Sequence, residues 1–228
     1  MTEKSGKAHR TEWRIAVDAN ETTALFEPGT NGSDTVFVCA HGAGGQMNDK
    51  GMTSLAKSLT SHGLGVVRFN FLYTAKGSSR PDPMPRLEEC FSAVVARVRD
   101  ELAPRRLIIG GRSMGGRAGS MMASKGFTCD GLLLFAYPLH PAGHPEKLRD
   151  AHLPAIHVPA LCFNGTRDPL CTPALMEAAL KTVGTRWDMH WLEGADHGFH
   201  VPKSSGKTDA DVLDEVAVST SKWIDSLQ

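Results

Sequence analysis

Three residue types that together can perform nucleophilic catalysis occur in a fixed order along the chain. Ser113 lies in the segment GRSMG, Asp168 in TRDPL and His197 in ADHGF. A serine hydroxyl is a weak nucleophile unless a histidine removes its proton and a carboxylate orients that histidine. The residue types therefore predict acyl-transfer chemistry, with Ser113 as nucleophile, His197 as general base and Asp168 as orienting acid.

The serine lies in a glycine-rich segment, GGRSMGGRAGS (110–120), that directly follows the apolar run RLIIG. A G-x-S-x-G pattern between a strand and a helix is typical of a sharp turn that lifts a serine hydroxyl out of a sheet. We expect Gly111 and Gly115 to allow this turn, and Gly116 and Gly119 to let the helix pack closely against the sheet. The segment matches neither G-x-x-x-x-G-K-[ST] nor G-x-G-x-x-G, so a phosphate-binding loop is not predicted.

A second glycine-rich segment, HGAGG (41–45), follows the apolar run TVFVCA. Acyl transfer passes through a tetrahedral oxyanion, which two preorganised N–H groups stabilise. We expect Ala43 and Met114 to supply these groups, with Gly44 as the alternative to Ala43. Further candidates for substrate contact are Gly42, Gly44 and Tyr137.

Two nearby residues are alternatives for the histidine and the acid. His200 lies three residues beyond His197, and Asp196 directly precedes it. We favour His197 because it is nearer to the end of the strand expected at 186–194. We favour Asp168 because neighbouring side chains seldom point at each other.

The elements that must position these residues alternate between strands and helices. A nearly continuous apolar run such as 35–40 is typical of a strand buried on both faces. Further strands are expected at 65–71, 105–111, 131–137, 160–165 and 186–194, and an antiparallel ribbon at 12–18 and 22–28. Helices are expected at 52–63, 86–102, 114–126, 173–183 and 209–227. The alternation predicts an α/β fold with a doubly wound, mostly parallel sheet, whose ligands bind beyond the carboxyl ends of the strands.

Length and charge narrow the class of protein. At 228 residues the chain is long enough for one domain with a substantial core. We expect residues 1–10 to form a disordered tail and residues 11–228 to form a single domain without a separate cap. The 25 basic and 25 acidic residues give a formal net charge of zero, so neither nucleic acid nor a membrane is an expected partner.

The histidines and cysteines do not favour a metal site or a disulfide framework. Four histidines lie between two expected strands, but no carboxylate or cysteine completes a recognisable zinc spacing; they are His140, His144, His152 and His157. The five cysteines are odd in number and lack CxxC spacing, which favours free thiols in a reducing compartment. The segment MTEKSGKAHR lacks the hydrophobic stretch of a secretory signal. We therefore expect a cytoplasmic protein with neither metal nor cofactor.

Taken together, the motifs resemble a small single-domain α/β-hydrolase family. The segments that carry the resemblance are HGAGG, GGRSMGGRA, YPLHPAGHPEKLRDAHL, GTRDP and EGADHGF, in that order. The family includes dienelactone-hydrolase-like proteins, a testis-expressed hydrolase-like protein and the hydrolase-like domain of an NSL complex subunit. The resemblance implies the α/β-hydrolase fold, with Ser113, Asp168 and His197 at the catalytic positions. Dienelactone hydrolases themselves use a cysteine nucleophile where this chain has Ser113.

The sequence thus predicts a serine hydrolase that cleaves a small carboxylic ester or thioester through an acyl-enzyme intermediate. The expected partner is a small acyl substrate. Two alternatives stay open at this point. One is a non-catalytic, hydrolase-like protein-interaction domain, and the other is a peptidase that acts on short peptides. The oligomeric state is open as well.

Overall fold

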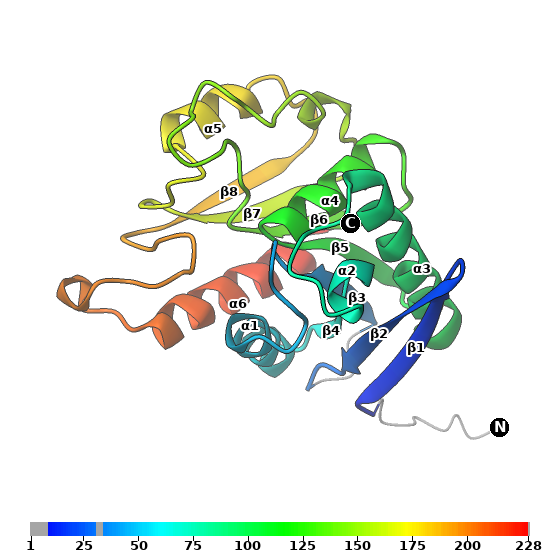
Figure 1. Cartoon of the computed structure of the whole chain (residues 1–228). Coiled ribbons are helices and arrows are strands. Elements are labelled where there is room, and N and C mark those ends of the chain that lie inside the picture. Colours follow the sequence, from blue (N-terminus) through cyan, green and yellow to red (C-terminus); the bar gives the residue numbers. More distant parts are fainter. Residues whose placement is uncertain (1–8, 31–33, 228) are drawn as a thin grey trace.

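The computed structural model describes residues 9–30 and 34–227, so residues 1–8 of the expected tail lie outside the described residues. The strands are β1 (Thr11–Val17), β2 (Asn20–Glu27), β3 (Thr35–Ala40), β4 (Gly65–Phe69), β5 (Arg106–Arg112), β6 (Gly131–Phe135), β7 (Ala160–Gly165) and β8 (Trp187–Leu192). Within the described residues they form one sheet in the order β1-β2-β4-β3-β5-β6-β7-β8 (Figure 1). β2 pairs antiparallel with β1 and β4, and the other neighbours pair parallel. The predicted mostly parallel α/β sheet is confirmed.

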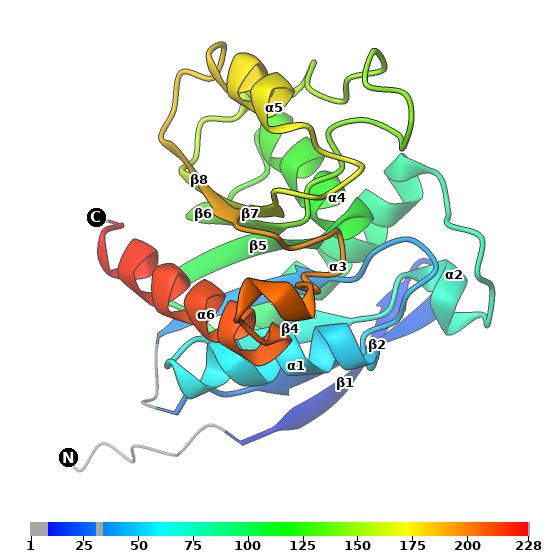
Figure 2. The same cartoon turned by 90° about the vertical axis from the view of Figure 1, so that its left-hand side faces the viewer.

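Helices cover both faces of this sheet. They are α1 (Lys50–Ser61), α2 (Leu72–Ala75), α3 (Met84–Leu102), α4 (Met114–Ser124), α5 (Pro173–Leu180) and α6 (Asp209–Asp225), with 3₁₀ turns at Leu153–Ala155 and Lys203–Ser205. α1 and α6 lie side by side on one face (Figure 2), where they share a core with Phe37 and Leu133. α3, α4 and α5 pack on the other face with Val38 and Leu134. Consecutive residues of a strand point to opposite faces of the sheet, and each face packs against a hydrophobic core. The residues on both faces must therefore be apolar, which explains the unbroken apolar runs.

The ends of several elements differ from the prediction. β4 and β6 each end two residues early, at Phe69 and Phe135. The chain leaves the sheet after β6 through Ala136, whose φ is 51°. α2 was not predicted, because four residues are too few to show helical periodicity.

Among the described residues, no helix has the length and apolar character needed to cross a membrane.

The junction between β5 and α4, which holds Ser113, packs against β3 with almost no space between the backbones. Gly111 has a φ of 136°, and a Cβ built on it would lie 2.1 Å from the carbonyl oxygen of Ala40. The corresponding distance from Gly115 to the same oxygen is 2.4 Å. A Cβ on Gly119 would lie 2.9 Å from the backbone of β5. The roles predicted for these glycines, to allow the turn and the close helix packing, are confirmed.

Replacing Gly111 with alanine should therefore lower the free energy of unfolding by at least about 3 kcal/mol, because it adds a steric collision to an unfavourable φ. Gly126→Ala is the matched control. Gly126 also has a positive φ, 82°, but its Cβ would meet nothing within 4 Å, so only the backbone strain of about 1 kcal/mol applies. Urea unfolding measures both losses. Equal losses in the two variants would contradict the steric explanation.

Candidate active site

Ser113 occupies the turn between β5 and α4 in a backbone conformation that L-residues seldom adopt. Its φ is 50° and its ψ is −116°. The Ser113 N–H donates to the carbonyl of Phe135 at the end of β6 (2.8 Å), and its carbonyl accepts from the Arg117 N–H in the first turn of α4 (3.0 Å). Both sides of the turn are thus anchored. Non-glycine residues held in such a conformation are concentrated at functional sites.

The side chains of Ser113, His197 and Asp168 form one hydrogen-bonded chain. His197 Nδ1 lies 2.8 Å from Asp168 Oδ2, and His197 Nε2 lies 3.0 Å from Ser113 Oγ. Because a carboxylate only accepts, Nδ1–H donates to Asp168, which leaves Nε2 to accept the hydroxyl proton of Ser113. The three residues follow β5, β7 and β8 at the carboxyl edge of the sheet. The structure therefore brings together the three residues that the sequence singled out.

The alternative histidine and acid lie in other arrangements. His200 Nδ1 contacts Asp209 Oδ2 at 2.6 Å, and 70% of the His200 side chain is exposed. The Asp196 carboxylate accepts the backbone N–H groups of Gly198 (2.7 Å) and His200 (3.0 Å). Asp196 thus shapes the loop that carries His197. The histidine ring hydrogen-bonds to Asp168.

The segment 41–45 folds so that its N–H groups are unequally available. The Gly44 N–H donates to the hydroxyl of Tyr73 (3.3 Å). In the described part of the chain, the Ala43 N–H has no backbone or side-chain acceptor, nor has the N–H of Met114, the first residue of α4. A Cβ on Gly42 would lie 3.4 Å from Ser113 Cβ, so the segment runs directly beside the serine. Between the two predicted donors of this segment, Ala43 is the free one.

A buried histidine that the sequence analysis left without a role orients the peptide before Ala43. His41 Nδ1–H donates to the carbonyl of Gly42 (2.8 Å), and His41 Nε2 accepts the N–H of Phe71 (3.1 Å). Burial lowers the pKa of His41, so the ring stays neutral with its proton on Nδ1. Since C=O and N–H point in opposite directions in a trans peptide, a Gly42 carbonyl held by His41 turns the Ala43 N–H away from it.

The expectation that Tyr137 contacts substrate is wrong. The Tyr137 side chain is fully buried, and its hydroxyl donates to the carbonyl of Arg149 (2.8 Å). Burial also raises its pKa well above the ordinary value. Its place near the end of β6 was predicted correctly, but the ring points into the core between the sheet and α4. It supports the loop 138–149 instead of lining a crevice.

Comparison with known proteins now gives the family. Residues 33–225 match the family model described as an alpha/beta hydrolase domain. The chain belongs to this α/β-hydrolase family.

Solved structures agree with that assignment. An α/β serine hydrolase homologue from Coxiella burnetii matches with a TM-score of 0.76 at 21% identity, over 94% of this chain and 99% of that one. Dienelactone hydrolase from Anabaena variabilis matches with a TM-score of 0.74 at 18% identity, over 96% and 99%. A curated relative, the quorum-quenching protein AidA of Acinetobacter baumannii, is 28% identical over 110 residues, which cover 45% of this chain and 36% of AidA. The α/β-hydrolase resemblance is confirmed, and the narrower link to the testis-expressed and NSL-complex proteins stays a prediction.

A buried amide holds Asp168 of this α/β-hydrolase in place. Asn164 lies on β7 with no exposed surface, and its Nδ2 donates to Asp168 Oδ2 (3.2 Å) and to the carbonyl of Tyr137 (3.1 Å). Its Oδ1 accepts the Tyr137 N–H (3.1 Å). The second carboxylate oxygen of Asp168 accepts the N–H of Leu170 (2.8 Å). Asn164 was not predicted to belong to the site, although a polar residue inside the apolar run ALCFNG was a visible signal.

The four histidines between β6 and β7 do not converge on one point. His140 is buried, where Nδ1–H donates to the carbonyl of Pro141 (3.0 Å) and Nε2 accepts the N–H of Thr172 (3.1 Å). His152 Nε2 lies 2.9 Å from the hydroxyl of Ser120 on α4. Throughout residues 9–30 and 34–227, no group of three or more histidine, cysteine, aspartate or glutamate residues has a metal-binding arrangement. His140 and His152 hold this segment against the start of α5 and against α4.

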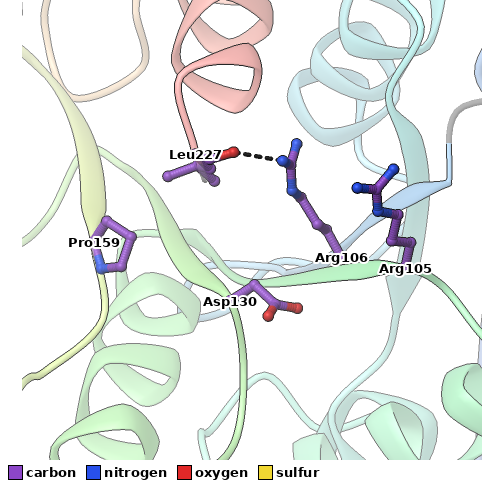
Figure 3. A pocket seen from close by; sticks show the side chains of 5 residues that line it. All are labelled: Arg105, Arg106, Asp130, Pro159 and Leu227. Atoms are coloured by element: carbon purple, nitrogen blue, oxygen red, sulfur yellow. Dashed lines mark hydrogen bonds between the residues drawn. The ribbon is translucent and has the colours of Figure 1, made fainter.

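Two cavities mark opposite ends of the sheet. One of about 500 Å³ is bordered by Tyr73, Lys76 and Arg80, and Tyr73 places it beside the segment 41–45. The other, of about 300 Å³, lies where β5 begins (Figure 3), whereas Ser113 lies where β5 ends. Its lining residues are Arg105, Arg106, Asp130, Pro159 and Leu227. This second cavity is therefore remote from the candidate site.

Replacing Asn164 with leucine should lower the free energy of unfolding by about 2–4 kcal/mol, because it leaves the Tyr137 backbone groups buried without their partner and removes a donor from Asp168. Chemical denaturation measures the loss. Cys39→Ala, a substitution on β3 that removes a buried sulfur without touching Asn164 or its partners, is the comparison. A smaller loss in Asn164→Leu than in Cys39→Ala would contradict the role given to the amide.

The stability contributed by His152 should depend on pH. Burial, assisted by the nearby Arg117 cation, lowers the pKa of His152 from 6.5 to about 4. Between these values the unfolded chain binds the proton and the folded chain does not, so stability is complete above pH 6.5 and falls as the pH drops toward 4. His152→Gln should remove this part of the pH dependence in denaturation experiments. A difference between the two proteins that stays constant from pH 7 to pH 4 would contradict it.

Proposed function

We propose that this α/β hydrolase is a serine hydrolase that cleaves small carboxylic esters or thioesters through an acyl-enzyme intermediate. The observation that carries the proposal is the hydrogen-bonded chain from Asp168 through His197 to Ser113, with distances of 2.8 and 3.0 Å. It supplies a nucleophile, a base and a residue that orients the base.

In the first half-reaction, Ser113 Oγ attacks the carbonyl carbon of the substrate while His197 Nε2 takes its proton. Asp168 stabilises the imidazolium that forms, because it already accepts the Nδ1–H bond. The carbonyl oxygen becomes an oxyanion and accepts hydrogen bonds from the N–H groups of Ala43 and Met114. The amino terminus of α4, directly after Ser113, adds a favourable electrostatic field.

Collapse of this intermediate breaks the bond to the leaving alcohol or thiol, which receives the proton from His197. The acyl group is then bonded to Ser113. Water repeats the attack with His197 again as base, which releases the carboxylic acid and restores the serine. Every proton moved in this cycle passes through His197 Nε2, so the proton transfers of both half-reactions balance without a metal or cofactor.

The segment between β6 and β7 favours a small acyl substrate. Residues 136–159 contain a single 3₁₀ turn, Leu153–Ala155, and no α-helix that could build a cap over the site, which suits an accessible crevice. The intact chain of three catalytic side chains favours an enzyme over the alternative of a non-catalytic interaction domain. A peptidase uses the same residues, so amide substrates belong in the same assay.

The protein should react covalently with a fluorophosphonate probe, and Ser113→Ala should abolish the labelling. Hydrolysis of p-nitrophenyl acetate should fall by at least about 10³-fold in the same variant. Ser120→Ala is the matched control, because Ser120 is a buried serine on α4 that hydrogen-bonds to His152. It should label like the wild-type protein. Folded wild-type protein that does not label would contradict the proposal and favour the interaction-domain alternative.

A further inference from the structure

Arg112, which directly precedes Ser113, reaches across to the loop that carries His197. Its Nη2 donates to the carbonyl oxygen of His197 itself, at 2.7 Å. The same guanidinium lies over the ring of Phe199, with Cζ 5.3 Å from the ring centroid. One side chain thus contacts two points of residues 195–200, which we call the histidine loop. The reaction steps described above do not use this contact.

The histidine loop is tightly folded but depends on outside contacts for its position. Within it, Asp196 accepts two backbone N–H groups, and Phe199 takes a φ of 65° with its side chain buried. On one side, the Ala195 carbonyl accepts the N–H of Arg167, after β7 (3.0 Å). On the other side, Arg112 connects the loop to β5. Hydrogen bonds therefore connect the loop to the segment after β7, which carries Asp168, and to the end of β5, directly before Ser113.

The surroundings of Arg112 are unusual for a residue that serves stability alone. Burial lowers the pKa of Arg112, while Asp196 and Asp168 attract it through space. Its described hydrogen bond goes to a backbone carbonyl and not to a carboxylate. Burying a guanidinium is costly, and an apolar side chain of similar size often stabilises a protein at least as well. What a guanidinium supplies and an apolar chain does not is a planar donor of fixed direction.

We propose that Arg112 is a positioning residue that fixes His197 relative to Ser113. Arg112 and Ser113 are consecutive, and the accepting carbonyl belongs to His197, so the contact closes a ring of three residues around the Ser113 Oγ–His197 Nε2 hydrogen bond. A ring this small restricts how far the imidazole moves from the hydroxyl. The inference rests on the proposed function, because its consequence is a faster proton transfer from Ser113.

Arg112→Met tests the role, because it keeps much of the side-chain volume and removes the donor. The chain offers a matched control at the other end of the same strand. Arg106 also donates to backbone carbonyls, those of Ile224 (3.2 Å) and Leu227 (Figure 3), and it lies at the edge of the sheet remote from Ser113. Arg106→Met therefore removes the same kind of contact without touching the histidine loop. Arg112→Lys, which keeps a charge and a donor, provides the conservative variant.

The readout is the second-order rate of fluorophosphonate labelling, together with the fraction of sites that finally label. In Arg112→Met the rate should fall about 10- to 100-fold while the final fraction stays at the wild-type value. Arg112→Lys should recover part of the rate. In Arg106→Met the rate per labelled site should be unchanged, even where its melting temperature is lower. An Arg112→Met protein that labels at the wild-type rate per site, or an equal slowing in Arg106→Met, would overturn the inference.

A second readout does not depend on catalysis. Hydrogen exchange of the amides in the histidine loop should become faster in Arg112→Met and stay unchanged in Arg106→Met. Unchanged exchange in Arg112→Met would overturn the positioning role. If the folded wild-type protein does not label at all, the proposed function fails by itself, and the exchange comparison still decides whether Arg112 holds the loop.

Discussion

The backbones of β3, β5 and α4 meet so closely around the carbonyl of Ala40 that glycine is required at Gly111 and Gly115. This contact determines where the strand stops and where the helix starts, and only Ser113 lies between them. The chain makes the connection with a φ of 50° at Ser113. The hydroxyl is consequently held at the carboxyl edge of the sheet, beside the segment 41–45 and within reach of the loops that follow β7 and β8. The geometry of the whole site depends on this close approach.

Neutral hydrogen-bonding side chains hold the parts around that turn. His41 fixes the peptide that precedes Ala43, Asn164 fixes Asp168, and His140 connects the segment after β6 to the start of α5. Neutral donors and acceptors set directions as firmly as charges do, but they cost much less to bury. Three hydrogen-bond donors to Asp168 offset the free-energy cost of burying its carboxylate. Two charged side chains also hold this region: Asp196 accepts N–H groups within the loop that carries His197, and Arg112 donates to the carbonyl of His197 itself.

The order Ser113, Asp168, His197 could be predicted from the sequence because parallel strands end at one edge of a sheet. Each residue follows a recognisable strand, so the three had to come near one another. Tyr137 was predicted wrongly, since a position near the end of a strand does not say whether a side chain faces the crevice or the core. Asn164, His41 and Arg112 were missed for a different reason. Their partners lie far away along the chain, at Tyr137, Phe71 and His197, and no local sequence pattern shows that these segments meet.

By itself, the sequence determined the α/β alternation, the glycine positions of the turn at Ser113 and the identity of the three side chains that form the hydrogen-bonded chain, Asp168, His197 and Ser113. These features are local, because they depend on periodicity, backbone freedom and residue type within a few positions. Only the tertiary structure decided which of Ala43 and Gly44 has a free N–H and which way Tyr137 points. Those choices depend on contacts between segments separated by tens of residues, and packing settles them when the sheet brings its strand ends together.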